Sequence, residues 1–189
     1  MRKIVIIGPA GAGKSTLARE LSKILDIEVF HLDRYFWQPG WKELPKKARI
    51  EKLQELVQKD KWIIEGSYFS TSDVRLQSCD TVIFLDMPLL LCLQRVLARR
   101  FNKQQQQRLD LPVGCKERLS PRYMAKLLLF PFIGRKTLVN KLDKVKRGKC
   151  KVLRSRDEVA AFLNAQREFA SVPSYKQTVS VTQLVPARV

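Results

Sequence analysis

A glycine-rich segment near the amino terminus carries the clearest chemical signal in the chain. Residues 8–15 read Gly-Pro-Ala-Gly-Ala-Gly-Lys-Ser and fit the pattern G-x-x-x-x-G-K-[ST] at every defined position. Glycines let backbone N–H groups approach phosphate oxygens without a Cβ clash, and the following helix adds positive partial charge. Lys14 then reaches the β- and γ-phosphates, and the Ser15 hydroxyl ligates magnesium. The segment therefore predicts a P-loop that binds ATP and Mg²⁺. Its expected phosphate contacts are Gly8, Pro9, Ala10, Gly11, Ala12, Gly13, Lys14, Ser15 and Thr16.

Two flanking elements must position this loop. Lys3–Ile7 is a continuous β-branched apolar run, which is typical of a strand buried on both faces of a parallel sheet. After the loop, apolar residues recur at helical spacing and predict a helix from about Lys14 to about Asp26. This context argues against a glycine turn that contains a lysine by chance.

Apolar runs and amphipathic segments alternate along the rest of the chain. The further predicted strands are Glu28–Leu32, Trp62–Glu65, Thr81–Asp86 and Lys151–Arg154. The further predicted helices start at Pro45, run from Pro88 to about Lys103, cover Tyr123–Lys144 with a bend at Pro131, and cover Asp157–Phe169. Residues 34–44 are expected to form an irregular loop. The alternation predicts an α/β sandwich around a parallel sheet.

We expect a single domain over residues 1–170. Within it, residues 104–122 break the regular pattern with a glutamine run, two prolines and a glycine, which predicts a basic insertion. Residues 171–189 are polar and contain two prolines, so we expect a flexible tail.

The positive charge of the chain is concentrated in one stretch. The formal charge is +18, from 36 Lys and Arg residues against 18 Asp and Glu. Residues 95–156 hold 19 of the basic residues and three of the acids, which leaves the rest of the chain close to neutral. Such a stretch predicts polyanionic partners: nucleotide phosphates, nucleic acid or an anionic membrane surface.

The cysteines and apolar runs indicate the compartment. The four cysteines are widely spaced without a CxxC pair, as expected of free thiols in a reducing cytoplasm. The apolar run after Lys3 has only four residues before the glycine loop, which argues against a signal peptide. Leu127–Ile133 contains a proline and is too short for a bilayer span. We therefore expect a cytoplasmic protein with no membrane partner.

Four stretches together resemble the nucleoside-monophosphate-kinase-like P-loop proteins. Within them, the resemblance is to the adenylate-kinase-related group often labelled DNA topology modulation proteins. The stretches are Gly8–Thr16, His31–Trp41, Trp62–Tyr68 and Val82–Pro88 with the helix that follows. The first is diagnostic by itself, and the others gain weight from their order and spacing over about residues 1–100.

The resemblance implies a fold and an activity. The implied fold is a three-layer P-loop NTPase sandwich with a five-stranded parallel sheet of order 2-3-1-4-5, which binds ligands at the carboxyl ends of its strands. The implied activity is transfer of the γ-phosphoryl group of ATP to a small acceptor, such as a nucleotide or nucleoside. A short basic lid, here residues 104–122, would close over the site.

Two carboxylates stand at the carboxyl ends of predicted strands, Asp33 just beyond the second and Glu65 as the last residue of the third, and the resemblance gives both a role. Asp33 would orient the acceptor hydroxyl, accept its proton or hold magnesium through water, and its alternative is an Asp that caps a turn. Glu65 replaces the Asp of related kinases and would reach magnesium through water, and its alternative is a strand-end residue facing solvent. For Asp86, capping the next helix is the simplest interpretation.

Several arginines are candidates for binding charge that develops in the transition state. Arg95 and Arg99 lie one helical turn apart on one face, with Arg100 beside them, and Arg118 and Arg122 follow in the lid. Lid arginines that arrive on closure stabilise the transferring phosphoryl group. The alternative for each is a solvated surface side chain.

The loop after the third strand faces the acceptor pocket in the family. Tyr68 and Arg75 are therefore candidate acceptor contacts, although Arg75 also fits an ordinary surface arginine. The aromatic residues beside Asp33 either stack on a nucleobase or anchor their loop on the core. Two functions are thus open: a small-molecule kinase, or a nucleic-acid-associated ATP-binding protein whose working surface is residues 95–156.

Overall fold

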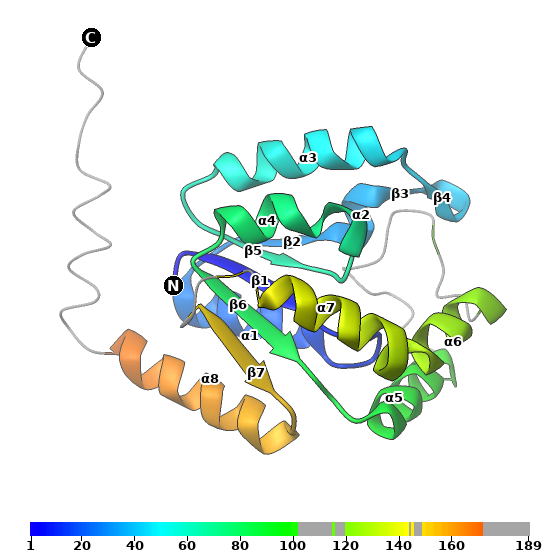
Figure 1. Ribbon diagram of the computed structural model, residues 1–189. Coiled ribbons are helices and arrows are strands. Elements are labelled where there is room, and N and C mark those ends of the chain that lie inside the picture. Colours follow the sequence, from blue (N-terminus) through cyan, green and yellow to red (C-terminus); the bar gives the residue numbers. More distant parts are fainter. Residues whose placement is uncertain (102–114, 116–119, 144, 146–148, 172–189) are drawn as a thin grey trace, which may run out of the picture.

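A computed structural model describes residues 1–101, 115, 120–143, 145 and 149–171 (Figure 1). At its centre lies a five-stranded sheet of order β2-β5-β1-β6-β7. Its strands are β1 (Lys3–Ile7), β2 (Val29–His31), β5 (Trp62–Glu65), β6 (Thr81–Leu85) and β7 (Cys150–Leu153). All neighbours pair in parallel, with Ile4 opposite both Ile63 and Thr81. Numbered as main strands, this is the order 2-3-1-4-5, as the resemblance predicted.

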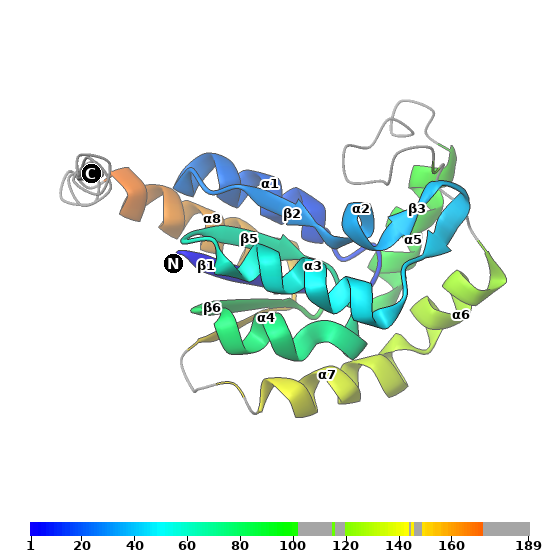
Figure 2. The same ribbon diagram turned by 90° about the horizontal axis from the view of Figure 1, so that it is seen from above.

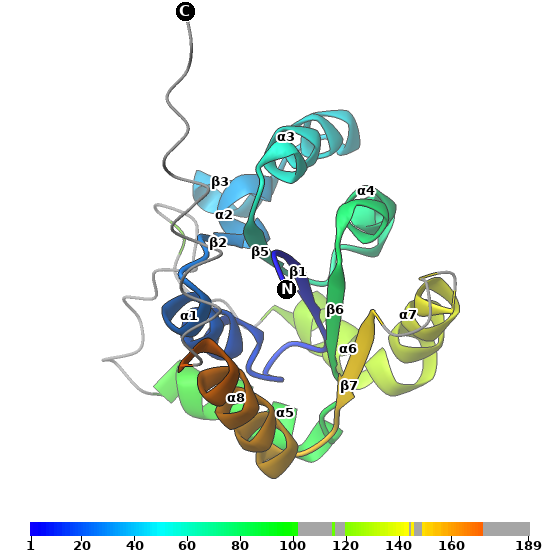
Figure 3. The ribbon, with the colours of Figure 1, turned by 90° about the vertical axis from the view of Figure 1, so that its left-hand side faces the viewer.

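The sheet is buried because its strands are apolar on both faces. Strands β1, β5 and β6 are buried along nearly their whole length, and their β-branched residues favour the pleated backbone. One core cluster packs the sheet against α1 (Lys14–Leu25), α5 (Leu89–Phe101) and α8 (Arg156–Ser171). The other packs it against α3 (Lys46–Gln58), α4 (Ser72–Ser78) and α7 (Arg135–Leu142). Figures 2 and 3 show the three layers that result.

The carboxyl ends of the strands share one edge of the sheet. The strand arrows in Figure 1 point toward the side on which α2 (Leu32–Phe36), α5 and α6 (Pro121–Leu128) lie. The segments that follow β1, β2 and β5 therefore meet there, and with them lie the P-loop after β1, Asp33 in α2 and Glu65 at the end of β5.

Residues 34–44 are regular, contrary to the expected irregular loop. The second strand ends at His31, and the chain then forms α2, β3 (Trp37–Gln38), a 3₁₀ turn η1 (Pro39–Trp41) and β4 (Lys42–Glu43), with β3 and β4 antiparallel. Leu32 and Phe36 are fully buried on the α2 face, so core packing rather than local propensity selects this helix. Gly40, at φ 76°, makes the hairpin turn.

The helix expected over residues 123–144 is two helices. Helix α6 begins at Pro121 after the cap of Ser120, whose Oγ accepts a hydrogen bond from the Tyr123 backbone N–H at 3.2 Å. A π-helical turn η4 (Phe130–Gly134) separates it from α7. Pro131 lies in this turn and cannot donate a backbone hydrogen bond, which is why the regular helix is interrupted.

The other predicted elements agree with the structure to within about two residues at each end, but residues 69–78, which were expected to be a loop, form a 3₁₀ turn and the helix α4. The 3₁₀ turn η2 (Phe69–Thr71) precedes α4. Of the predicted lid, only Cys115 and residues 120–122 are among those described, and all but Ser171 of the predicted tail lies outside them. Across the described ranges, none of the helices has the length and apolar character to cross a bilayer.

Candidate active site

The P-loop connects β1 to α1 and depends on close backbone approach. Gly11 has φ +79°, and a Cβ there would lie 2.4 Å from the Cys92 carbonyl oxygen of α5. The loop is thus pressed against the first turns of α5, and only glycine fits this position. Helix α1 begins at Lys14, so its first N–H groups point into the loop, where the positive end of the helix attracts phosphate.

Ser67 secures the start of this loop and was not predicted from the sequence. The Gly8 backbone N–H donates to Ser67 Oγ at 3.0 Å, and Ser67 Oγ donates to the Gly8 carbonyl at 2.5 Å. The pair ties the P-loop to the chain just after β5. The signal available in the sequence was a hydroxyl two positions beyond a strand that neighbours β1.

Lys14 lies over its own loop, in the electrostatic field of the other site residues. Its Nζ donates to the Pro9 carbonyl oxygen at 2.9 Å. Burial lowers the pKa of Lys14, the Glu65 and Asp33 carboxylates oppose that shift, and the Arg99 guanidinium adds to it. The structure therefore brings together four predicted site residues that come from four different elements.

Glu65 is the centre of a buried hydrogen-bonded group. Its Oε1 accepts from the Ser15 hydroxyl at 3.1 Å and lies 2.9 Å from His31 Nδ1. Only 4% of Glu65 is exposed, so the alternative of a solvent-facing strand-end residue is wrong. The bond to His31 was not predicted.

The chemistry of this group fits magnesium. A hydroxyl and a carboxylate supply the hard oxygen ligands that Mg²⁺ prefers, with water and nucleotide phosphates completing its coordination. Within the described ranges, no three His, Cys, Asp or Glu side chains gather to hold a metal by themselves. Ser15 and Glu65 would therefore hold Mg²⁺ together with the phosphates of bound nucleotide, consistent with magnesium that arrives with ATP.

Asp33 lies in the first turn of α2 and accepts a hydrogen bond from the Tyr68 hydroxyl at 2.5 Å. The same hydroxyl accepts from Trp37 Nε1 at 2.6 Å. Burial and the adjacent Asp33 raise the pKa of Tyr68, so the tyrosine stays protonated and donates to the carboxylate. Trp37 and Tyr68 therefore fix the orientation of Asp33, a role that the sequence did not reveal for Trp37.

The aromatic residues of this region chiefly anchor it. Phe36 is fully buried and packs edge-to-face on Tyr68, with ring centroids 4.7 Å apart. Tyr35 packs on Phe30, and Trp41 on Trp37. Of the two interpretations, stacking on a nucleobase or anchoring the loop on the core, these contacts match anchoring.

Arg95 contacts the P-loop from outside. Its Nη1 donates to the carbonyl oxygens of Gly11 at 3.3 Å and Ala12 at 3.0 Å. These two bonds tie the P-loop to α5. Arg99, one turn along α5, contributes to the field around Lys14. Of the predicted lid arginines, Arg118 lies outside the described residues, as do the side chains of Arg100 and Arg122.

Arg75 is fully buried, so the interpretation as a surface arginine is wrong. Its Nη2 lies 3.5 Å from the Tyr68 carbonyl oxygen, while Nε and Nη1 have no hydrogen-bond partner among the described residues. Burial lowers the pKa of Arg75 to about 10, and the Glu65 carboxylate opposes that shift. The guanidinium remains charged at neutral pH beneath the loop that carries Tyr68.

Asp86 pairs with an arginine and does not cap α5. Its carboxylate accepts from Arg135 Nε at 3.0 Å and Nη2 at 2.9 Å, which is a bidentate pair. Helix α5 begins three residues later, at Leu89, after Pro88. The pair instead fastens the first turn of α7 to the carboxyl end of β6, a contact between segments 49 positions apart.

No family model matches the chain. The chain is 33% identical over 107 residues to the uncharacterized protein YqaC of Bacillus subtilis (strain 168), a match that covers 54% of this chain and 58% of that protein. It is also 58% identical over 33 residues to a shikimate kinase of Blochmanniella floridana, which is 18% of each chain. The matches thus span less than two thirds of the length of either relative.

Solved structures with the same fold include two shikimate kinases. The enzyme from Acinetobacter baumannii, in complex with shikimate, aligns with a TM-score of 0.51 at 19% identity over 98% of this chain and 96% of that one. The enzyme from Bacteroides thetaiotaomicron aligns with a TM-score of 0.52 at 14% identity over 89% of this chain and 98% of that one. At these identities the likeness concerns the fold. The chain therefore has the P-loop fold of small-molecule kinases of the nucleoside-monophosphate and shikimate type.

Proposed function

We propose that this protein is an ATP-dependent phosphotransferase that moves the γ-phosphoryl group of ATP to a hydroxyl of a small acceptor. The observation that carries the proposal is the hydrogen bond from the P-loop residue Ser15 to Glu65 Oε1 at the carboxyl edge of the sheet. Asp33 lies at the same edge, two residues beyond His31, whose Nδ1 is 2.9 Å from that carboxylate oxygen. A P-loop with two carboxylates at the same edge of the sheet supplies both a nucleotide site and a proton acceptor. The shikimate-kinase-like fold supports the same reaction class.

The transfer divides among the residues of the site. The loop amides and Lys14 hold the β- and γ-phosphates, and Ser15 and Glu65 hold Mg²⁺, which neutralises phosphate charge when bound. Asp33 orients the acceptor hydroxyl and takes its proton as the acceptor oxygen bonds to the γ-phosphorus and the bond to ADP breaks. Arg99, with Arg100, Arg118 and Arg122, stabilises the charge on the equatorial oxygens, and Arg95 keeps the loop amides aligned.

The acceptor is proposed to carry an anionic group as well as a hydroxyl. A buried guanidinium with two unpaired donor nitrogens is costly, and an anion is the partner that would satisfy it. Arg75 Nη2 lies 3.5 Å from the backbone carbonyl oxygen of Tyr68, and the hydroxyl of Tyr68 is bonded to Asp33. An acceptor of this kind would therefore place its anionic group at Arg75 and its hydroxyl at Asp33. Nucleotides and shikimate-like hydroxy acids both meet this description.

The alternative is a nucleic-acid-associated ATP-binding protein, with DNA topology modulation as the related label. Several basic side chains of residues 95–156 already form ion pairs with acidic residues of the same chain. Arg135 and Arg154 pair with Asp86, and Lys141 pairs with Asp73 at 2.8 Å. Structural use of these charges favours the kinase over a dedicated nucleic-acid surface.

The Asp33→Asn substitution tests the proposal. ADP release is measured with Mg²⁺ and ATP against nucleoside monophosphates, nucleosides and shikimate as acceptors. We expect Asp33→Asn to leave ATP affinity nearly unchanged and to lower acceptor-dependent turnover by about a hundredfold or more. Tyr68→Phe should cause a smaller loss, because the carboxylate remains. Asp73→Asn, on an exposed carboxylate of α4, is the matched control. Normal transfer by Asp33→Asn, or no stimulation by any acceptor, would defeat the proposal.

A further inference from the structure

The bend between α6 and α7 exposes a cluster of large apolar side chains. Phe132 and Ile133, in η4, are 73% and 62% exposed, and Leu128 and Leu129 beside them are also exposed. Isolated exposed apolar residues are normal on protein surfaces, but four within six consecutive positions are not. We call these four residues the apolar knuckle.

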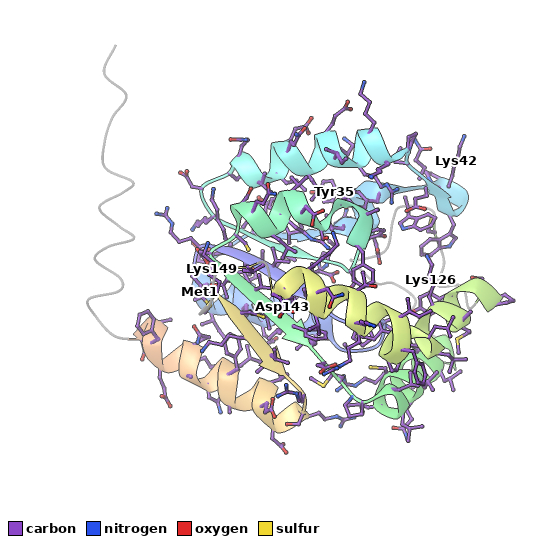
Figure 4. The ribbon with its side chains drawn as sticks, viewed as in Figure 1. Met1, Tyr35, Lys42, Lys126, Asp143 and Lys149 are labelled. Carbon is purple, nitrogen blue, oxygen red and sulfur yellow. The ribbon has the colours of Figure 1, made fainter. Side chains whose placement is uncertain are left out.

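The surroundings of the knuckle are exclusively basic in sequence. Residues 120–142 contain five Lys and Arg residues and no Asp or Glu, and two of the five, Arg135 and Lys141, are paired with Asp86 and Asp73. Lys126 is exposed on the α6 side of the bend (labelled in Figure 4), and Lys136 is exposed on the α7 side. The knuckle is therefore an apolar tip with cations on both flanks.

The protein interior holds the knuckle outward. On one side of the bend, Leu127 packs in the core cluster with α1, α5 and α8. On the other side, Leu138 and Leu142 pack in the cluster with α3 and α4. Arg135, next to η4, is fastened to Asp86 by two hydrogen bonds. The backbone is thus anchored on both flanks, so the exposed side chains need little reorganisation to bind a surface.

We propose that the apolar knuckle binds an anionic phospholipid surface. Phenylalanine and aliphatic side chains enter the boundary between headgroups and acyl chains, while flanking lysines attract anionic lipid. Such binding lies on the membrane and needs no spanning helix. It differs from the expectation of no membrane partner, because that expectation concerned apolar length and not exposed side chains.

Charge and chemistry disfavour two other occupants. A second copy seated symmetrically on this face would place two sets of cations together with no acid from residues 120–142 to compensate them. A nucleic acid would satisfy Lys126 and Lys136, but it would leave the aliphatic residues Leu128, Leu129 and Ile133 without an apolar partner. An anionic lipid surface offers acyl chains to the apolar side chains and negative charge to the lysines.

Vesicle co-sedimentation of the full chain tests this inference. Binding is compared between vesicles of phosphatidylcholine alone and vesicles that also contain phosphatidylglycerol. We expect binding to the anionic vesicles only, weakened by salt. The double variant Phe132→Ser, Ile133→Ser should bind at least about tenfold more weakly, and Lys126→Glu with Lys136→Glu should do likewise.

Matched controls test whether exposed apolar or basic residues elsewhere on the protein have the same effect on vesicle binding. Phe169→Ser removes an aromatic that is 60% exposed on α8, and Lys47→Glu with Lys52→Glu reverses two exposed lysines of α3. Neither should change vesicle binding, and thermal unfolding confirms that all variants are folded. Absence of vesicle binding overturns the inference, as do equal losses in the controls. A dimer in light scattering, or a nucleic-acid complex, that the knuckle variant disrupts without any lipid binding also overturns it.

Discussion

The Ser15 hydroxyl donates a hydrogen bond to Glu65 Oε1 at 3.1 Å, across 50 positions of sequence. His31 Nδ1 lies 2.9 Å from the same oxygen, so a P-loop residue, a strand-end carboxylate and the single histidine of the chain form one group. The hydroxyl that binds magnesium in P-loop proteins is thus preoriented by the carboxylate proposed to hold the outer shell of the metal. This relationship joins Glu65 to the P-loop and gives the first prediction.

Glu65→Gln should weaken magnesium use while leaving the fold intact. The amide keeps the shape of the side chain but removes the negative charge that Ser15 and the metal share. We expect the Mg²⁺ concentration for half-maximal turnover to rise by about tenfold or more. Glu55→Gln, on the exposed face of α3, is the control. An unchanged magnesium dependence would remove Glu65 from the metal site.

Arg75→Met should separate acceptor binding from stability. If the guanidinium is held ready for an anion, its replacement by an apolar side chain of similar length removes a buried, incompletely paired charge. We expect the free energy of unfolding to stay within about 1 kcal/mol of the original. The KM for the acceptor should rise by about tenfold or more, since an anion loses its charged partner. Strong destabilisation with an unchanged KM would show a purely structural arginine.

Gly11→Ala should damage the P-loop far more than Gly40→Ala. Both glycines have positive φ, of +79° and +76°, so backbone strain of about 1–2 kcal/mol is common to both substitutions. Only at Gly11 would the new Cβ collide, at 2.4 Å from the Cys92 carbonyl oxygen, whereas Gly40 faces open space. We expect Gly11→Ala, but not Gly40→Ala, to lose ATP affinity. The free energy of unfolding should also fall further in Gly11→Ala than in Gly40→Ala. Calorimetric titration with ATP and chemical denaturation measure the two effects, and equal behaviour of the variants would contradict the prediction.

Asp80 should contribute to stability at neutral pH and lose that contribution in acid. Burial raises the pKa of its carboxyl, but hydrogen bonds from the Lys3 and Arg2 backbone N–H groups and the Thr81 hydroxyl outweigh this, so the pKa falls below 3.8. A lowered pKa in the folded state stabilises the protein above the unfolded value, and the contribution disappears as pH falls through the folded value. Asp80→Asn should therefore flatten the loss of thermal stability as the pH falls below about 5. Asp60→Asn, on an exposed loop, should leave the acid profile unchanged.

Local sequence patterns were sufficient to predict those elements whose structure depends on one short segment. Strand Trp62–Glu65 was predicted with its observed ends, because four buried residues bounded by Gly66 allow little else. The helix over residues 123–144 was predicted as one piece, and the bend at Pro131 was expected. Its division into two helices with a π-helical turn depends on packing into two separate core clusters, which periodicity does not reveal.

By itself, the sequence determined the glycine-rich loop, the five strands of the sheet and most of the long helices, because glycine spacing and apolar runs act over a few neighbouring residues. The strand order came from the family resemblance, and the short elements of residues 32–43 and 69–78 were not predicted. Tertiary structure decided which side chains meet. It buried Arg75, joined Glu65 to Ser15 and His31, and used Asp86 to hold Arg135. These contacts connect residues that are 34 to 50 positions apart in the sequence, or fill a core whose shape several elements define together. Hydrogen bonds and burial depend on distance in space, and the folded sheet alone sets that distance.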